Sequence, residues 1–138
     1  MFSNYLGNVS LPVHAEKVGT QTWQQEAKKE TPQDVPPARQ VPTMFFSATR
    51  SDQRGEIYLK VVNAIGSAQT VQVDLAGAAR VAAEGKAIVL ASANKEDTNT
   101  IAEPTKVVPV TSKASGLGKK FSYSFAPYSV TVLVLSTK

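Results

Sequence analysis

The chain has 138 residues, 42% of them hydrophobic and 19% charged, which is typical of a single globular domain and excludes wholesale disorder. Its formal net charge of +4 comes from scattered basic residues, so the basic stripe expected of a nucleic-acid-binding protein is missing. The absence of cysteine excludes disulfides and thiolate chemistry, and no apolar run is long enough to span a membrane.

Residues 1–13 predict the end of a helix followed by a short strand. Apolar side chains recur at a helical spacing and are followed by Gly7, which favours helix termination. These apolar residues are Met1, Phe2, Tyr5 and Leu6. Residues 9–13 then alternate between apolar and other side chains, and Pro12 indicates an edge strand because it cannot donate to a ladder. The segment lacks the basic and apolar regions of a signal peptide, and the sequence leaves the cellular compartment unknown.

Residues 14–42 form a polar, Pro-rich excursion. Gln, Lys, Glu, Thr and Pro dominate it, and PQDVPPARQVP closes it. Residues 21–30 have the composition of a short helix capped by Thr22, but isolated helices of this length are marginal in water. We therefore expect an exposed loop with a short helix, on which Trp23 and Ala27 give one weak apolar spot.

Residues 43–91 contain four predicted strands. Residues 43–50 and 56–63 flank a turn-rich link, which predicts a hairpin. Residues 70–75 alternate as a half-buried strand and are expected to form a second hairpin with the strand before them. Residues 86–91 give a further strand.

Residues 92–118 are mostly irregular. Asn94, Asp97 and Asn99 suit turns in which a side chain bonds its own backbone. The valines around Pro109 predict a short edge strand over residues 107–110.

Residues 119–135, KKFSYSFAPYSVTVLVL, predict two strands and the corner between them. Phe121, Tyr123 and Phe125 alternate with serines, so the three aromatic side chains share one face. Pro127 removes a ladder donor and ends the pairing. The run that follows is apolar on both faces, which predicts a central strand.

About eight strands at a spacing of roughly ten residues, without a strong helix, predict the fold class. We expect an all-β, jelly-roll-like antiparallel sandwich of two sheets, with closure into a barrel as the alternative.

Candidate catalytic and metal-binding residues are few. Glycoside hydrolysis needs two carboxylates held about 5 to 10 Å apart in a cleft. The acids here fall largely in loops and on outward positions, and Glu96 and Asp97 lie in a turn-rich loop. His14 is the only histidine, so a catalytic triad has no support. Residues 94–99 lack the glycine and the terminal glutamate of a helix-loop-helix calcium site, so we predict no catalytic, cofactor or metal residue in this chain.

The aromatic residues suggest a carbohydrate-binding function, because a sugar-binding β-sandwich presents exposed rings on which sugars stack. Trp23, in the excursion, and Tyr58, on the less apolar face of its strand, are the predicted carbohydrate contacts. Tyr123 and Tyr128 fit core and corner packing better.

Particular strings add a resemblance. The chain contains, in order, MFSN followed by LPV, SATRSDQRGEIYLKVVN, EDTNTIAEPTKVVPV and FSYSFAPYSVTVLVL. Together they resemble the C-terminal β-sandwich domain of family 51 α-L-arabinofuranosidases. The resemblance spans nearly the whole chain and departs mainly at residues 14–40, where the family usually has a shorter connection.

The resemblance implies a division of the chain and a partner. In the family this domain follows a (β/α)8 barrel that carries both catalytic glutamates and releases terminal arabinofuranosyl units from arabinoxylan and arabinan. None of that barrel is in this sequence, so neither glutamate has a counterpart here. Residues 1–8 would be a remnant of the last barrel helix, with Met1, Phe2 and Tyr5 at the interface with the barrel. Residues 9–138 would be the single β-sandwich domain.

Two partner hypotheses and three functions stay open. The family sandwich takes strand material from before the barrel, so we expect residues 14–40 or another copy of the chain to cover a sheet edge. The favoured function is a non-catalytic accessory domain. The alternatives are an independent carbohydrate-binding module that contacts plant cell-wall polysaccharide and a small enzyme in its own right.

Overall fold

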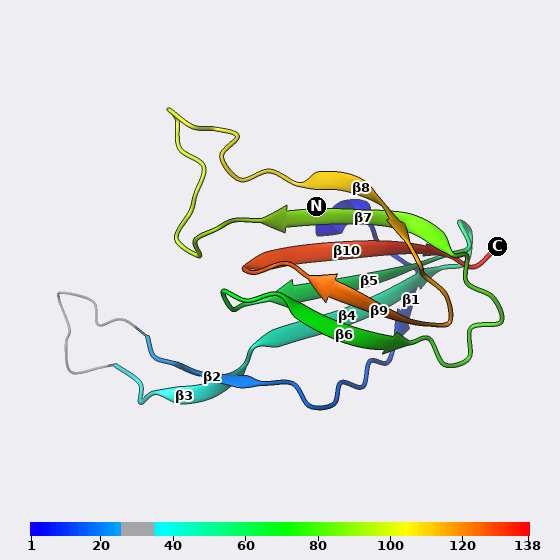
Figure 1. The fold of residues 1–138 in the computed structure, drawn as a ribbon, viewed down its shortest axis with the longest axis horizontal. Helices are drawn as coiled ribbons and strands as arrows, with labels where there is room; N and C mark the ends of the chain where they lie inside the picture. The colour runs from blue at the N-terminus through cyan, green and yellow to red at the C-terminus, as the bar shows by residue number, and fades with distance from the viewer. Residues whose placement is uncertain (26–34) are drawn as a thin grey trace.

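The computed structural model describes residues 1–25 and 35–138, and within them the regular structure is all-β apart from one 3₁₀ turn, η1 (Phe2–Asn4) (Figure 1). The described strands are β1 (Val9–Leu11), β2 (Thr20–Trp23), β3 (Arg39–Pro42), β4 (Met44–Ser51), β5 (Glu56–Asn63), β6 (Gln69–Asp74), β7 (Glu84–Ala91), β8 (Val110–Ser115), β9 (Lys120–Phe125) and β10 (Ser129–Ser136). Every pairing between them is antiparallel. The predicted fold class is confirmed.

The strands form one large sheet and two small ones. The large sheet has the order β1-β4-β5-β10-β7-β8, while β6 pairs with β9 and β2 pairs with β3. Figure 1 shows β6 and β9 lying across one face of the large sheet, which gives the two layers of the sandwich. β10 lies between β5 and β7, so the prediction that the last apolar run is a central strand is confirmed. Burial on both faces explains why that run does not alternate.

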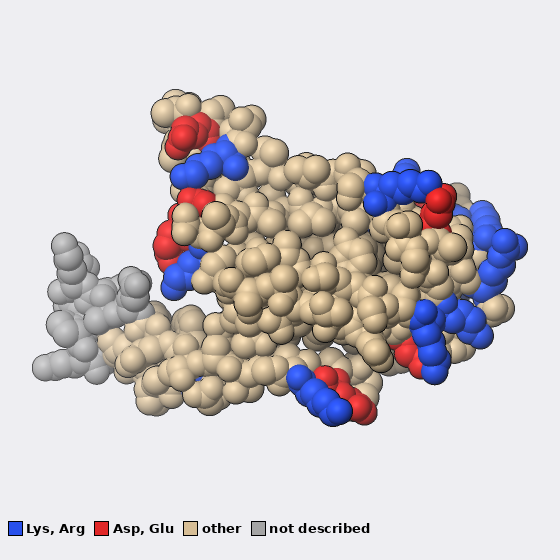
Figure 2. Space-filling view, viewed as in Figure 1, with Lys and Arg blue, Asp and Glu red and all other residues tan. Residues whose placement is uncertain are grey.

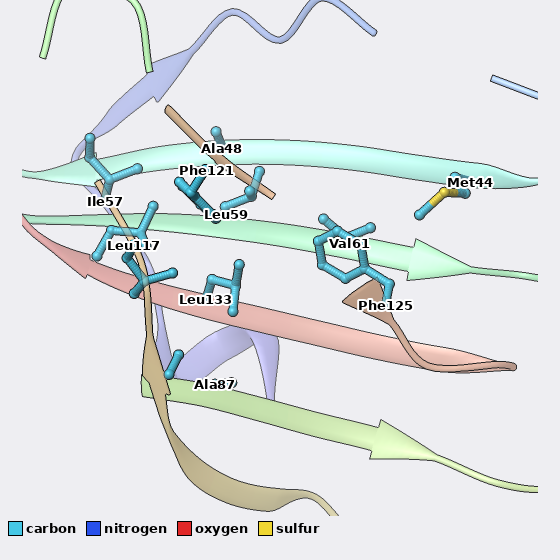
Figure 3. Close-up of a cluster of buried hydrophobic side chains, with 12 residues drawn as sticks. Met44, Ala48, Ile57, Leu59, Val61, Ala87, Leu117, Phe121, Phe125 and Leu133 are labelled. Carbon is cyan, nitrogen blue, oxygen red and sulfur yellow. The ribbon is translucent and has the colours of Figure 1, made fainter. Parts of the chain in front are cut away.

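The main core lies between the large sheet and the β6–β9 layer. Leu133 and Leu135 of β10 are fully buried there, and Phe121 and Phe125 of β9 pack against them from the other layer. Figure 3 shows side chains from β4, β5, β7, β9 and β10 pointing into this shared interior. The alternation of aromatics with serines in β9 therefore has the physical cause that the sequence suggests, one buried face and one exposed face.

A buried amide connects the two layers where the chain passes from β9 to β10. Asn63, at the end of β5, is 1% exposed. Its Nδ2 donates to the backbone carbonyls of Ser67 and Ala126, each at 2.8 Å. Tyr128 closes the corner with a φ of 43° and donates its backbone N–H to the Ile65 carbonyl at 3.0 Å. The Asn63 amide thus ties the predicted corner to the loop after β5, and the Ser129 hydroxyl adds a second hydrogen bond to the Ala126 carbonyl at 2.7 Å.

Several local expectations are wrong. The expected helix at residues 21–30 is strand β2 up to Trp23, and residues 26–34 lie outside the described part of the chain. β6 pairs with β9 instead of β5, so the second hairpin does not form. The strand expected at residues 107–110 does lie at a sheet edge, as β8, but it begins only at Val110. These errors share a cause, because strand pairing over long separations is not visible in local patterns.

The first residues also differ from expectation. Where the spacing predicted the last turns of a helix, a single 3₁₀ turn forms, and the Tyr5 backbone N–H donates to the Phe2 carbonyl at 3.1 Å. The domain division, with residues 1–8 as a barrel remnant, stays a prediction.

Candidate functional site

The face of the large sheet opposite the β6–β9 layer is called the outer face here. A small buried cluster lies at its centre, made of Tyr58, Ile88, Val132 and Val134. Met1 and Tyr5 pack against this cluster, and the Tyr5 and Tyr58 rings meet edge to face with centroids 5.9 Å apart. Two of the three predicted interface residues therefore lie against the outer face, where they cover part of it.

The third predicted interface residue, Phe2, lies near the same surface. Its ring is 39% exposed, and the Lys60 ammonium lies 5.4 Å from its centroid. This contact is a cation–π geometry, and it leaves Lys60 only 9% exposed. The interface role of these residues is still a prediction.

Tyr58 cannot serve as the sugar platform predicted for it. Its side chain is 0% exposed under Tyr5, and its hydroxyl donates to Glu56 Oε2 at 2.7 Å. Burial, and then this hydrogen bond to Glu56, raises the pKa of Tyr58 above its usual value. Tyr58 is therefore excluded as a carbohydrate contact, because its ring has no exposed face on which a sugar could stack.

A row of apolar side chains crosses the outer face beside the buried cluster. Phe45 pairs with Val62, Val62 with Val130, and Val130 with Leu90, so four adjacent strands contribute one residue each. Residues that pair directly across a ladder lie on the same face of the sheet. Phe45 is 47% exposed and the other three are half-buried. We call these four residues the outer row.

Trp23 lies outside both layers, on the ribbon that β2 and β3 form. It is 42% exposed and pairs across the ribbon with Arg39, whose guanidinium carbon lies 4.9 Å from the ring centroid. The structure thus keeps Trp23 accessible, while its role as a carbohydrate contact stays a prediction.

The candidate acids are held in hydrogen bonds and ion pairs with neighbouring side chains. Asp97 is held by Ser92 and by Lys106, whose ammonium lies 3.1 Å away, and these contacts lower the pKa of its carboxyl, the Ser92 hydrogen bond most of all. His14 is exposed and faces Glu16 at 3.3 Å. The shallow depression between β7 and β8 contains one carboxylate, Glu84, which pairs with Lys113 at 2.6 Å.

Among residues 1–25 and 35–138, no group of three or more His, Cys, Asp or Glu side chains is arranged to hold a metal ion. None of the helical segments in that same part of the chain has the length and apolar character needed to cross a membrane.

The sequence profile of the α-L-arabinofuranosidase C-terminal domain matches residues 1–129. This chain belongs to that family. A relative, the extracellular exo-α-L-arabinofuranosidase of Streptomyces chartreusis, is 37% identical over 90 residues, which make up 65% of this chain and 10% of that protein. The resemblance seen in the sequence is thereby confirmed.

Solved structures agree with this assignment. An arabinose-bound family 51 α-L-arabinofuranosidase is 33% identical and superimposes with a TM-score of 0.64, over 70% of this chain and 15% of its own. The thermostable family 51 enzyme of Thermotoga petrophila matches 96% of this chain and 26% of its own with a TM-score of 0.76, at 18% identity, which shows the fold alone. The α-L-arabinofuranosidase C-terminal domain described here thus spans only 10% to 26% of the length of these three proteins.

Two features of these surfaces escaped the sequence analysis. The outer row depends on the register of four strands, and no local pattern reports which residues of distant strands lie opposite one another. Arg39 was read only as part of a Pro-rich link, yet it stacks on Trp23. An arginine and a tryptophan on two short extended segments only weakly predict a cation–π contact, and the pairing of Trp23 with Arg39 is needed to place the two side chains together.

Proposed function

We propose that this chain is the non-catalytic C-terminal β-sandwich domain of an α-L-arabinofuranosidase, a glycoside hydrolase acting on terminal arabinofuranosyl residues of arabinoxylan and arabinan. Its role in the parent enzyme is to support the catalytic (β/α)8 barrel. The outer face, with Met1, Phe2 and Tyr5, is the surface that packs on the barrel.

The observation that carries this proposal is the outer row. A half-exposed phenylalanine beside three half-buried aliphatic side chains, aligned over four strands, is a contiguous apolar surface. The opposite face of the same sheet is covered by β6 and β9. The much greater length of the matched enzymes supports the barrel as the occupant of the outer face.

The absence of catalysis is tested with the purified chain and an aryl arabinofuranoside. We expect no arabinose release, while a complete family 51 enzyme in the same assay hydrolyses the substrate. Release that follows the chain through purification and stops on substitution of its own carboxylates would overturn the non-catalytic assignment.

Docking is tested by adding the chain to a family 51 barrel whose own C-terminal domain has been deleted. We expect the chain to slow thermal inactivation of the barrel, and Phe45→Asp to abolish that protection because a charge would be buried in the interface. Ile101→Asp is the matched control, since Ile101 is an apolar side chain that is fully exposed on the loop between β7 and β8. Equal protection by the wild-type chain and Phe45→Asp would contradict docking through the outer row.

Self-association through an uncovered sheet edge is the second partner proposal. In the described residues β6 and β9 pair only with each other, and β2 and β3 do likewise, so neither ribbon extends the large sheet. Sedimentation at increasing concentration should show a dimer that survives Phe45→Asp, because edge pairing uses backbone groups. A monomer at every concentration would contradict this proposal.

A further inference from the structure

We propose that the β2–β3 ribbon carries a binding site for uncharged glycan chains, with Trp23 as the stacking platform and Arg39 as its positioning partner. The inference rests on the proposed function only in the choice of glycans to test. It concerns a surface separate from the outer row, so the two can fail independently.

The Trp23 indole is exposed and yet held in position by a neighbouring side chain. Trp23 is 42% exposed, although a large aromatic side chain on an ordinary surface is usually covered by packing. The Arg39 guanidinium lies 4.9 Å from the ring centroid and pairs with Trp23 in register across the ribbon. A cation stacked on an indole limits its rotamers, which lowers the entropy that a ligand must overcome on binding.

The ribbon is joined to the sandwich at its base, where Thr43 meets Gly19. The backbone N–H of Thr43 donates to the Gly19 carbonyl at 2.9 Å, and the Thr43 hydroxyl donates to the same oxygen at 3.1 Å. Val18 packs against the main core. On the face of the ribbon opposite Trp23, the Gln40 amide donates to the Thr22 hydroxyl at 2.8 Å and fixes the strand register. A platform held in this way is pre-organised for a ligand.

The described surroundings of the Trp23 ring are polar but almost uncharged. In its described residues, 18–25 and 35–42, the ribbon carries one charged side chain, Arg39, and the face of this region that Figure 2 shows has almost no charged surface. The ribbon's uncharged polar side chains are glutamines and threonines, whose amides and hydroxyls both donate and accept hydrogen bonds. Gln21 lies two residues before Trp23 in β2 and so shares its face of the ribbon.

These features favour a neutral sugar over other ligands. A sugar ring presents an apolar C–H face that stacks on an aromatic ring, and hydroxyls at its edge that pair with amides and guanidinium groups. A nucleic acid would require several cations along its phosphates, and the described ribbon provides one.

The experiment uses the fact that Trp23 is the only tryptophan in the chain, so intrinsic tryptophan fluorescence reports on this site alone. The full chain is titrated with soluble arabinan and xylan oligosaccharides, and with oligogalacturonate as a charged comparison. We expect a saturable blue shift with the neutral glycans that persists at high salt. Calorimetric titration of the same ligands gives the affinities of the variants, which lack this fluorophore or its partner.

The variants show whether glycan affinity depends on aromatic stacking at Trp23 or changes with any substitution. Trp23→Ala should weaken neutral-glycan binding by at least about tenfold, as expected for loss of a central aromatic anchor. Trp23→Tyr, which keeps an aromatic face, should recover part of the affinity. Arg39→Ala and Arg39→Lys should both weaken binding, because lysine keeps the charge but not the planar stack. Arg80→Ala is the matched control, since Arg80 is exposed outside the ribbon, and it should bind as the wild type does.

Four results would overturn the proposal: no fluorescence change with any neutral glycan, unchanged binding by Trp23→Ala, no recovery by Trp23→Tyr, or binding of oligogalacturonate alone that disappears at high salt. Barrel docking is measured with a different ligand and through Phe45, so a negative glycan result leaves the proposed function standing.

Discussion

The two faces of the large sheet are built from the same strands but are covered to different extents. On the inner face the side chains of β5 and β10 meet a second layer, and Phe125 of β9 is 1% exposed there. On the outer face Met1 and Tyr5 pack against the buried cluster and Phe2 contacts Lys60, while Phe45 remains 47% exposed. The inner face therefore buries the main core, while the outer face keeps part of its apolar surface accessible.

The largest expected effect comes from a matched pair of phenylalanines, one on each side of the sheet. Phe125→Ala should lower the free energy of unfolding by about 3 to 5 kcal/mol, because it removes a buried ring and leaves a cavity. Phe45→Ala should cost less than about 1 kcal/mol in the free chain, since half of that ring is already in water. Chemical denaturation of both variants measures the difference, and equal losses would remove the distinction between the faces.

The next effect concerns the connection between the layers. Asn63→Asp keeps the shape of the side chain but removes both amide donors and places a carboxylate against the Ser67 and Ala126 carbonyls. We expect a loss of about 2 to 4 kcal/mol in unfolding free energy at neutral pH. Asn99→Asp is the control, because Asn99 also donates to a carbonyl, that of Val107, but in an exposed loop. If Asn63→Asp lowers the unfolding free energy no more than Asn99→Asp does, the Asn63 amide does not connect the two layers.

The smallest expected effect is the pH-dependent contribution of Tyr58, in the buried cluster of the outer face, to the unfolding free energy. Tyr58→Phe removes the hydrogen bond to Glu56 and should cost about 1 kcal/mol at neutral pH. The folded-state pKa of Tyr58 is raised, so its contribution is complete below about pH 10 and is lost as the pH rises through the folded value. The stability difference between the wild type and Tyr58→Phe should therefore shrink above about pH 10. A constant difference in denaturation experiments across that range would argue against a buried, neutral Tyr58.

These comparisons also explain which predictions from sequence succeeded. The half-buried strand β9 and the central strand β10 could be predicted from sequence. Alternating side chains suit a strand with one buried face, and a continuous apolar run suits a strand that is buried on both faces. The pairing of β6 with β9 was missed because the two strands are far apart in sequence and either could have paired elsewhere. Trp23 was noticed as a residue type, but the Arg39 stack that holds it could not be foreseen.

The sequence by itself determined the β-class, the central last strand, the corner at Pro127 and the family, because local periodicity, turn chemistry and matching strings depend on neighbouring residues. Only the tertiary structure decided that Tyr58 is buried, that Phe45, Val62, Val130 and Leu90 form one row, and that Trp23 stands on a ribbon of its own. The physical reason is register: which residues of distant strands lie opposite one another is settled by the packing of the whole sheet.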